Sequence, residues 1–197
     1  VGAALRAGLS AERVRDMRME TDRLLLRPWE PRDLDPFATL NADPEVMRFF
    51  PSTRTREETT ELIERTTSLL AERDMSFLAV EEKASGDFVG MVGLAPVGPP
   101  MPCAPAVEIG WRLAKHHWGK GYAQEAARAW LAYGFGTLAL PEIVAFTFVG
   151  NTPSRRVMER LGMTRDPADD FEHPGIAAGH PIRPHVLYRL KAADFRA

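Results

Sequence analysis

Two spacings of apolar residues recur along the chain, and they divide it into strands and helices. Apolar residues recur at every second position in half-buried strands and every three or four positions in amphipathic helices. Clusters of Gly, Pro, Asn and Asp separate the two kinds of segment. The period of two predicts strands over residues 21–29, 76–82, 88–94, 106–114, 142–149 and 183–190.

Two helical segments are expected in the first half of the chain. Residues 33–50 form a helical region that Pro36 and Pro44 are expected to interrupt, because proline breaks helices. Thr55 with Glu58 three positions later is a capping box, which starts a helix. The residues that then recur at helical spacing are Leu62, Ile63, Thr66, Leu69 and Leu70.

Two further helices are expected in the second half. One runs from Tyr122 to about Phe135. Asn151 or Thr152 caps the other, Pro153 suits its first turn and Gly162 its end. The apolar face of the first helix comprises Ala123, Ala126, Ala127, Trp130 and Leu131.

Composition places the chain among globular proteins. Of its 197 residues, 45% are hydrophobic and 26% charged, and no repeat or low-complexity linker divides it. We therefore predict one α+β domain with a mixed sheet over residues 19–197. Residues 1–18 are small, polar and basic without a clear apolar stripe, and they are expected to form a flexible N-terminal extension.

Charge and cysteine content narrow the partners and the compartment. The formal charge is −2, from 25 basic and 27 acidic residues, which indicates neither a nucleic acid nor a membrane as partner. The lone Cys103 cannot form an intrachain disulfide. No apolar run approaches the roughly 20 residues that span a bilayer. A cytoplasmic location is therefore expected.

A glycine-rich turn lies between the strand at 106–114 and the helix at 122. Free N–H groups and the helix dipole favour an anion at such a helix start, Gly119 and Gly121 allow close approach, and Lys120 adds charge. A simple tight turn is the alternative. A dinucleotide fingerprint would require Gly or Ala where Gln124 stands, and no P-loop motif occurs.

The letters of this turn, WGKGYA, resemble the acyl-coenzyme A loop of the GNAT N-acetyltransferases, whose pattern is Q/R-x-x-G-x-G/A. Gly121 and Ala123 match the two small positions, and Trp118 stands where Gln or Arg is usual. Followed by Glu125 and Ala126, the loop is typical of the RimJ/RimL branch, the ribosomal-protein N-acetyltransferase type.

Three other segments resemble the same branch, in order and spacing. They are the opening strand TDRLLLRPWEPRD, the pantetheine-binding strand VEIGWRL and the helix NTPSRRVMERLGM, which corresponds to an N-x-x-S…GF motif. The resemblance implies a GNAT fold. In that fold a mixed central sheet is flanked by helices, and two splayed parallel strands bind acyl-coenzyme A.

The resemblance also implies how acetyl coenzyme A, the expected cosubstrate, is held. The backbone of Leu113 is expected to pair with the pantetheine arm, and Asn151 to contact the same arm from the neighbouring strand's end. The backbone amides expected to bind the pyrophosphate belong to Trp118, Gly119, Lys120, Gly121, Tyr122 and Ala123.

Two side chains are candidates for catalysis. Glu108 lies in the strand that should line the thioester gap and can take the proton of an amine; alternatively it faces solvent or pairs with an arginine. Many family members have tyrosine as acid seven residues after the Asn, but here that position is Met158. The branch implies Ser154 instead, hydrogen-bonding the sulfur; alternatively it only satisfies backbone N–H groups of the helix start.

The remaining histidines and aromatic residues give weaker signals. His173, His180 and His185 are widely spaced, and no Cys or carboxylate cluster accompanies them, so we expect no metal site. This tail is instead expected to shape the acceptor pocket. His116 and His117 are expected to be solvated. The aromatic residues that either line the acceptor pocket or belong to the core are Trp29, Phe49, Phe50 and Phe146.

The expected activity is therefore acetyl transfer from acetyl coenzyme A to a primary amine, by direct attack in a ternary complex. The acceptor is a protein N-terminus or a small-molecule amine. Alternatives are a longer acyl group such as succinyl and a non-catalytic acyl-coenzyme A sensor; a dehydrogenase is disfavoured. A homodimer is possible.

Overall fold

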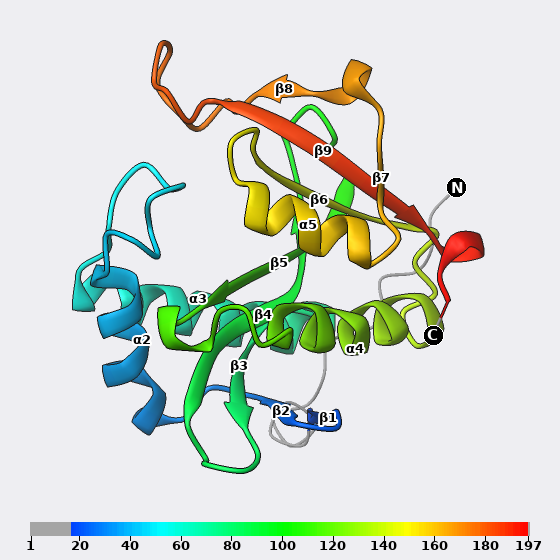
Figure 1. Cartoon of the computed structure of the whole chain (residues 1–197). Helices are drawn as coiled ribbons and strands as arrows, with labels where there is room; N and C mark the ends of the chain where they lie inside the picture. The colour runs from blue at the N-terminus through cyan, green and yellow to red at the C-terminus, as the bar shows by residue number, and fades with distance from the viewer. Residues whose placement is uncertain (1–16, 197) are drawn as a thin grey trace.

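A single mixed sheet organises the molecule, and the computed structural model describes it over residues 17–196 (Figure 1). Its strand order is β1-β2-β3-β4-β5-β6-β9-β7, with β8 also paired to β9. The strands are β1 (Met19–Glu20), β2 (Leu24–Arg27), β3 (Phe77–Glu82), β4 (Phe88–Val97), β5 (Ala106–Leu113), β6 (Glu142–Phe148), β7 (Thr164–Arg165), β8 (Phe171–Glu172) and β9 (Pro184–Lys191).

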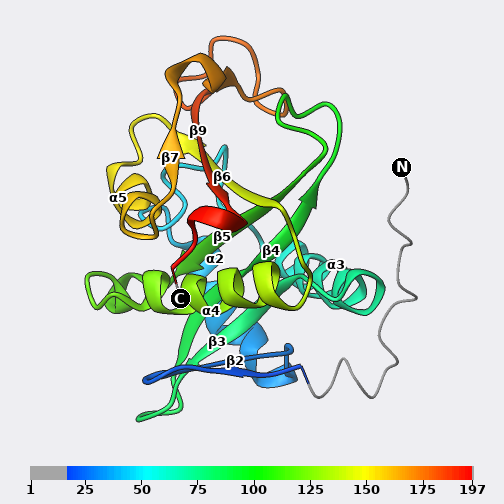
Figure 2. The ribbon, with the colours of Figure 1, turned by 90° about the vertical axis from the view of Figure 1, so that its right-hand side faces the viewer.

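Within residues 17–196, four α-helices flank the sheet: α2 (Leu34–Ala42), α3 (Arg56–Arg73), α4 (Tyr122–Gly136) and α5 (Thr152–Arg160). In Figure 1, α4 crosses in front of the sheet and α3 lies behind it, and Figure 2 shows the same arrangement from the side. The predicted caps are confirmed: Thr55 and Glu58 form the capping box of α3, and the Asn151 side chain caps α5.

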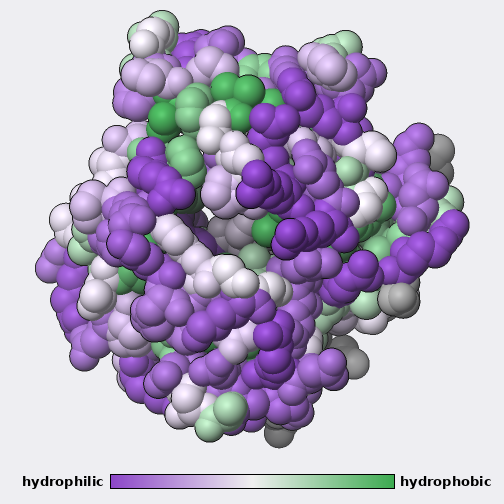
Figure 3. All heavy atoms as spheres, viewed as in Figure 1, coloured by the Kyte–Doolittle hydropathy of each residue, from purple (hydrophilic) through white to green (hydrophobic). Residues whose placement is uncertain are grey.

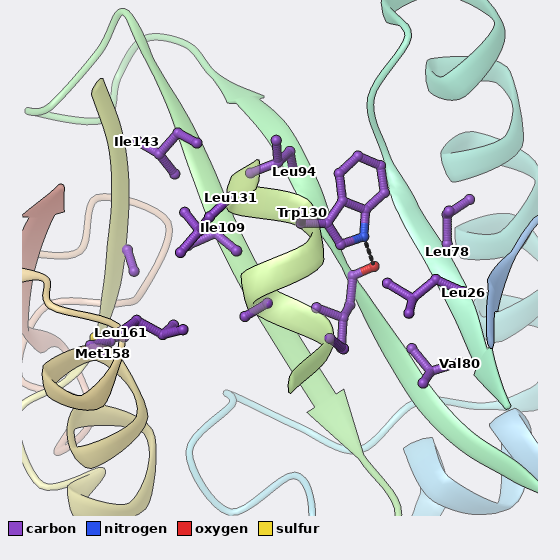
Figure 4. Packing of buried hydrophobic residues seen from close by; sticks show 14 of the residues in the cluster. Leu26, Leu78, Val80, Leu94, Ile109, Trp130, Leu131, Ile143, Met158 and Leu161 are labelled. Carbon is purple, nitrogen blue, oxygen red and sulfur yellow. Dashed lines mark hydrogen bonds between the residues drawn. The ribbon is translucent and has the colours of Figure 1, made fainter. Parts of the chain in front are cut away.

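The main core lies between the sheet and the helices α4 and α5. Trp130 of α4 is fully buried and its Nε1 donates to the carbonyl of Val92 at 3.0 Å, beside Leu94 and Ile109 of the sheet (Figure 4). A second cluster, which includes Phe37, joins α2 and α3 to the opposite face. Successive side chains of each strand thus point to opposite faces of the sheet, as the sequence predicts.

Two prolines lie differently from the sequence expectation. Pro36 does not interrupt α2, because it lies in the first turn, where the missing N–H would have no helical partner. Pro96 lies beyond the predicted strand of residues 88–94 but belongs to β4, opposite Val107. The pairing of β3 with β4 ends at Gly93, so the missing donor of Pro96 faces no strand on that side.

The predicted N-terminal extension lies, up to residue 16, outside the described residues. Met17, which falls within that extension, packs partly buried against the main core. Among residues 17–196, no helix combines the length and the apolar character that crossing a membrane requires.

Candidate active site

The sheet opens between β5 and β6, which are the one parallel pair among its described strands. The two strands share a single register pair, Glu108 with Val144, whereas the other neighbouring strands of the described sheet pair antiparallel. In Figure 1 the two strands diverge from this pair towards the start of α4, and Figure 3 shows the surface hollowed at the same place. The predicted splay of the parallel strands is therefore present.

The edge of β5 is exposed along this opening. The N–H of Ala114 donates to Val89 of β4, and alternate residues of a strand direct their backbone groups to opposite edges. Leu113 and Trp111 therefore direct their backbone groups towards the gap. Trp118 Nε1 donates to the carbonyl of Leu113 at 2.8 Å and ties the glycine turn to the end of the strand.

The glycine turn has the backbone geometry of an anion cradle. Gly119 and Gly121 both have positive φ, +76° and +83°, and Gly121 is the N-cap of α4. No side chain in the described part of the chain caps this helix, so the N–H groups of its first turn, at Tyr122 and Ala123, point outward without a capping acceptor. The side chain of Lys120 is exposed beside them, with its ammonium 5.7 Å from the Tyr122 ring.

An arginine from the other end of the sheet completes the positive surroundings of the cradle. The guanidinium of Arg23 lies 4.6 Å from the centre of the Tyr122 ring, and it is the nearest group to a side chain built at Gly121. Glu125 holds it in place through a 2.7 Å ion pair. Arg23 belongs to the opening segment TDRLLLRPWEPRD, but its local pattern does not indicate a position beside the glycine turn.

His117 differs from its predicted solvated state. Its side chain is only 2% exposed, and neither ring nitrogen has a hydrogen-bond partner within the described residues. Burial lowers the pKa of His117, and the nearby His116 and Lys120 lower it further. The short 3-10 helix Lys115–His117 turns the ring inward, next to Tyr122, so it supports the cradle from beneath. His116 is exposed, as predicted.

Glu108 lies where the two parallel strands part. Strand alternation places it on the face opposite Ile109, which is in the main core, and its side chain is partly buried. Burial raises the pKa of its carboxyl to about 7. Neither a salt bridge nor a side-chain hydrogen bond holds Glu108 among residues 17–196, so the pairing with an arginine is not present.

The start of α5 borders the gap from the β6 side. Asn151 Oδ1 accepts from the Ser154 N–H at 3.3 Å, and its Nδ2 donates to Thr147 at 2.9 Å, which fixes the amide at the end of β6. Ser154 is half-buried. Met158 is 2% exposed and lies in the main core, so the position of the usual tyrosine does not face the gap.

The predicted aromatic residues separate into core and site. Trp29 packs 4.7 Å from Phe37 in the core beneath α2, so it does not line the gap. Phe49, in the segment of residues 43–55 between α2 and α3, lies 6.0 Å from Phe148 of β6. In the same segment, the Phe50 ring lies 4.3 Å from the guanidinium of Arg112 on β5. This segment, the 43–55 loop, therefore contacts both strands that border the gap.

The histidine tail lies on the same sheet face as Glu108. Phe146 of β6 contacts Phe171, His173 and His185, whose rings lie 5.8 to 6.4 Å away. Burial lowers the pKa of both histidines. A cavity of about 200 Å³ adjoins this group, beside Val149, Phe171 and His185. His180 is not part of it. No group of three or more His, Cys, Asp or Glu in residues 17–196 is arranged for a metal ion.

Comparison with known proteins identifies the fold and its chemistry. The family described as Acetyltransferase (GNAT) domain matches residues 23–164. The chain belongs to this family. It is similar to a solved GNAT acetyltransferase of Bacillus anthracis, with a TM-score of 0.75 and 29% identity, over 90% of this chain and 99% of that one.

Two further proteins are similar to this chain in sequence. The protein YkkB of Bacillus subtilis is 36% identical over 74% of this chain and 84% of its own length. An FsC-acetyl coenzyme A-N(2)-transacetylase of Aspergillus fumigatus is 35% identical over 82% of this chain and 72% of its own length. This GNAT protein is an acyltransferase, and acetyl coenzyme A is its cosubstrate.

The described residues fit that cosubstrate. The uncapped first turn of α4 offers N–H donors for a pyrophosphate, and Gly119 and Gly121 keep side chains away from it. The open edge of β5 offers backbone groups to an extended amide-containing arm. Bound acetyl coenzyme A supplies a thioester, whose carbonyl carbon accepts a nucleophile.

Proposed function

We propose that this GNAT protein transfers the acetyl group to a primary amine, by direct attack while both reactants are bound. The position of Glu108 carries the proposal. Its carboxylate lies at the one pair that joins β5 and β6, where the gap begins, and its pKa is raised to about 7. A base with a pKa near the working pH is close to the optimum for proton transfer.

The proton path follows from this arrangement. Glu108 takes a proton from the incoming ammonium group, directly or through a water molecule. The free amine nitrogen then attacks the thioester carbonyl, the carbon–sulfur bond breaks, and the thiolate leaves and takes up a proton. Positioning and proton transfer each contribute a few orders of magnitude in rate.

Asn151 and Ser154 are proposed to serve the leaving group and its arm. The Asn151 amide is fixed at the end of β6 and can still accept or donate one further bond to the pantetheine arm. Ser154 lies one helical turn further and is proposed to hydrogen-bond the sulfur. Because Met158 is in the core, no strong acid is proposed at that position.

The acceptor remains a primary amine of a protein N-terminus or of a small molecule. The RimJ/RimL-type loop of Trp118 to Ala123 supports the first, and the name of the Aspergillus relative, an N(2)-transacetylase, is compatible with the second. Near-neutral net charge favours neither.

Release of thiol from acetyl coenzyme A tests the proposal, with a panel of amines and N-terminal peptides. Glu108→Gln is expected to lower turnover about a hundredfold or more. Glu64→Gln, at an exposed position of α3, is the matched control and keeps wild-type turnover. Binding of acetyl coenzyme A without turnover of any amine favours the sensor instead, and turnover with succinyl coenzyme A alone favours a longer acyl group.

A further inference from the structure

Two arginines beside the gap carry charges that no carboxylate of residues 17–196 neutralises. Arg112 lies on β5, on the same face as Glu108, and is only 8% exposed. Arg54 lies in the 43–55 loop and is half-buried. Neither forms an ion pair with a described residue, and the Nε atom of each is buried without a hydrogen-bond partner.

The contacts that Arg112 does make leave most of its donors free. One Nη donates to the Oδ1 of Asn41 at 2.6 Å, and the Phe50 ring covers the guanidinium. A guanidinium has five N–H donors in a planar fork that matches a carboxylate. Burial lowers the pKa of Arg112 to about 9, and the positive charge of Arg54 contributes to this shift. The group therefore stays charged near pH 7.

Such a pair is unfavourable for folding by itself. A buried charge without a partner is strongly disfavoured, and here a second positive charge lies nearby. By contrast, Arg27, also buried, has the carboxylates of Asp33 and Glu81 within 2.7 and 2.9 Å. The chain thus neutralises a structural buried arginine but leaves Arg112 uncompensated, which points to an anion supplied from outside.

We propose that Arg112 and Arg54 bind a carboxylate on the acceptor amine, so that this enzyme selects amines that carry a separate anionic group. The inference rests on the proposed function, because it places the amine at Glu108. On β5, Glu108 and Arg112 lie four positions apart, about 13 Å along an extended strand. Acceptors whose amine and carboxylate are several bonds apart therefore fit better than α-amino acids.

The location favours the acceptor over the coenzyme as the source of the anion. The glycine turn that fits the pyrophosphate lies at the start of α4, after β5, whereas Arg54 and Phe50 belong to the loop between α2 and α3. The same loop reaches β6 through Phe49 and Phe148. It therefore covers the side of the gap on which Glu108 lies.

The test compares two acceptors that differ in one charge, δ-aminovalerate and its primary amide δ-aminovaleramide, with acetyl coenzyme A. Wild type is expected to have at least a tenfold lower KM for the acid than for the amide. Arg112→Gln and Arg54→Gln are expected to raise the KM for the acid about tenfold to a hundredfold relative to the amide. Arg65→Gln, exposed on α3, is the matched control for loss of one positive charge.

A binding measurement separates this inference from the acetyl transfer itself. Glutarate, which has carboxylates but no amine, is titrated calorimetrically into wild type and Arg112→Gln. Binding to wild type alone supports the anion site even if no amine is acetylated. Thermal unfolding of Arg112→Gln is expected at the wild-type temperature or above, since the variant removes a buried charge; a purely structural arginine would lower it.

Three results would overturn the proposal. One is equal KM values for acid and amide in wild type, together with no binding of glutarate. Another is a weaker affinity of Arg112→Gln for coenzyme A, which would assign the arginines to a coenzyme phosphate. The third is a rise in KM in the variants that occurs only when succinyl coenzyme A replaces acetyl coenzyme A and the acceptor is the amide. That result would assign the bound carboxylate to the acyl chain.

Discussion

Replacing Glu108 by Gln should change the dependence of the rate on pH as well as its size. The substitution keeps the shape of the side chain and removes its ability to take a proton. With a pKa of about 7, Glu108 is about one tenth ionised near pH 6 and about nine tenths ionised near pH 8. The base contribution to kcat/KM should therefore rise about tenfold over this range and then level off.

The assay is thiol release from acetyl coenzyme A at saturating cosubstrate, with one amine, at several pH values between about 6 and 9. The amine itself loses a proton in this range, so the informative quantity is the ratio of kcat/KM for wild type to that for Glu108→Gln. The ionisation of the amine cancels in this ratio. We expect the ratio to be at least about 100 near pH 8 and to be about ten times smaller near pH 6.

Two results would refute this reasoning. A ratio that stays constant with pH would show that Glu108 does not act through its ionisation. A ratio close to one at every pH would show that proton removal does not involve Glu108. Unchanged affinity of Glu108→Gln for coenzyme A, measured by calorimetry, is the control that the gap itself is intact.

Three further predictions concern stability. Folding raises the pKa of Glu108 from 4.5 to about 7, so the folded protein holds this proton more tightly than the unfolded chain does. The free energy of unfolding of wild type should therefore fall as the pH rises through this range. Glu108→Gln should be more stable than wild type near pH 8, by up to about 3 kcal/mol, but not near pH 4.5. Gly121→Ala should lower the free energy of unfolding in urea by about 1 kcal/mol and raise the KM for acetyl coenzyme A, because the φ of Gly121 is +83°. Gly136→Ala, at the other end of α4, is the control and should leave the free energy of unfolding unchanged or raise it. Asp33→Ala should cost about 3 kcal/mol by the same measurement, because it leaves the buried guanidinium of Arg27 with fewer partners, and a loss under about 1 kcal/mol would contradict this.

Local pattern was sufficient for much of the fold. The capping box at Thr55, the cap at Asn151 and the hairpin of β3 and β4 follow from side chains within a few residues of one another. Strand alternation was also enough to place Glu108 opposite Ile109. Positive φ at Gly119 and Gly121 follows from the same local reasoning, since glycine alone adopts it without strain.

Tertiary structure decided what those elements do together, because the decisive contacts join residues far apart in the sequence. Only the divergence of β5 from β6 puts Glu108 at the start of a gap and raises its pKa through burial. Only the path of the 43–55 loop brings Arg54 beside Arg112, about sixty residues away in the chain, without a carboxylate between them. The sequence alone therefore determined which chemistry the chain can hold, while the packing of distant segments determined which charges are buried and where the reactants can meet.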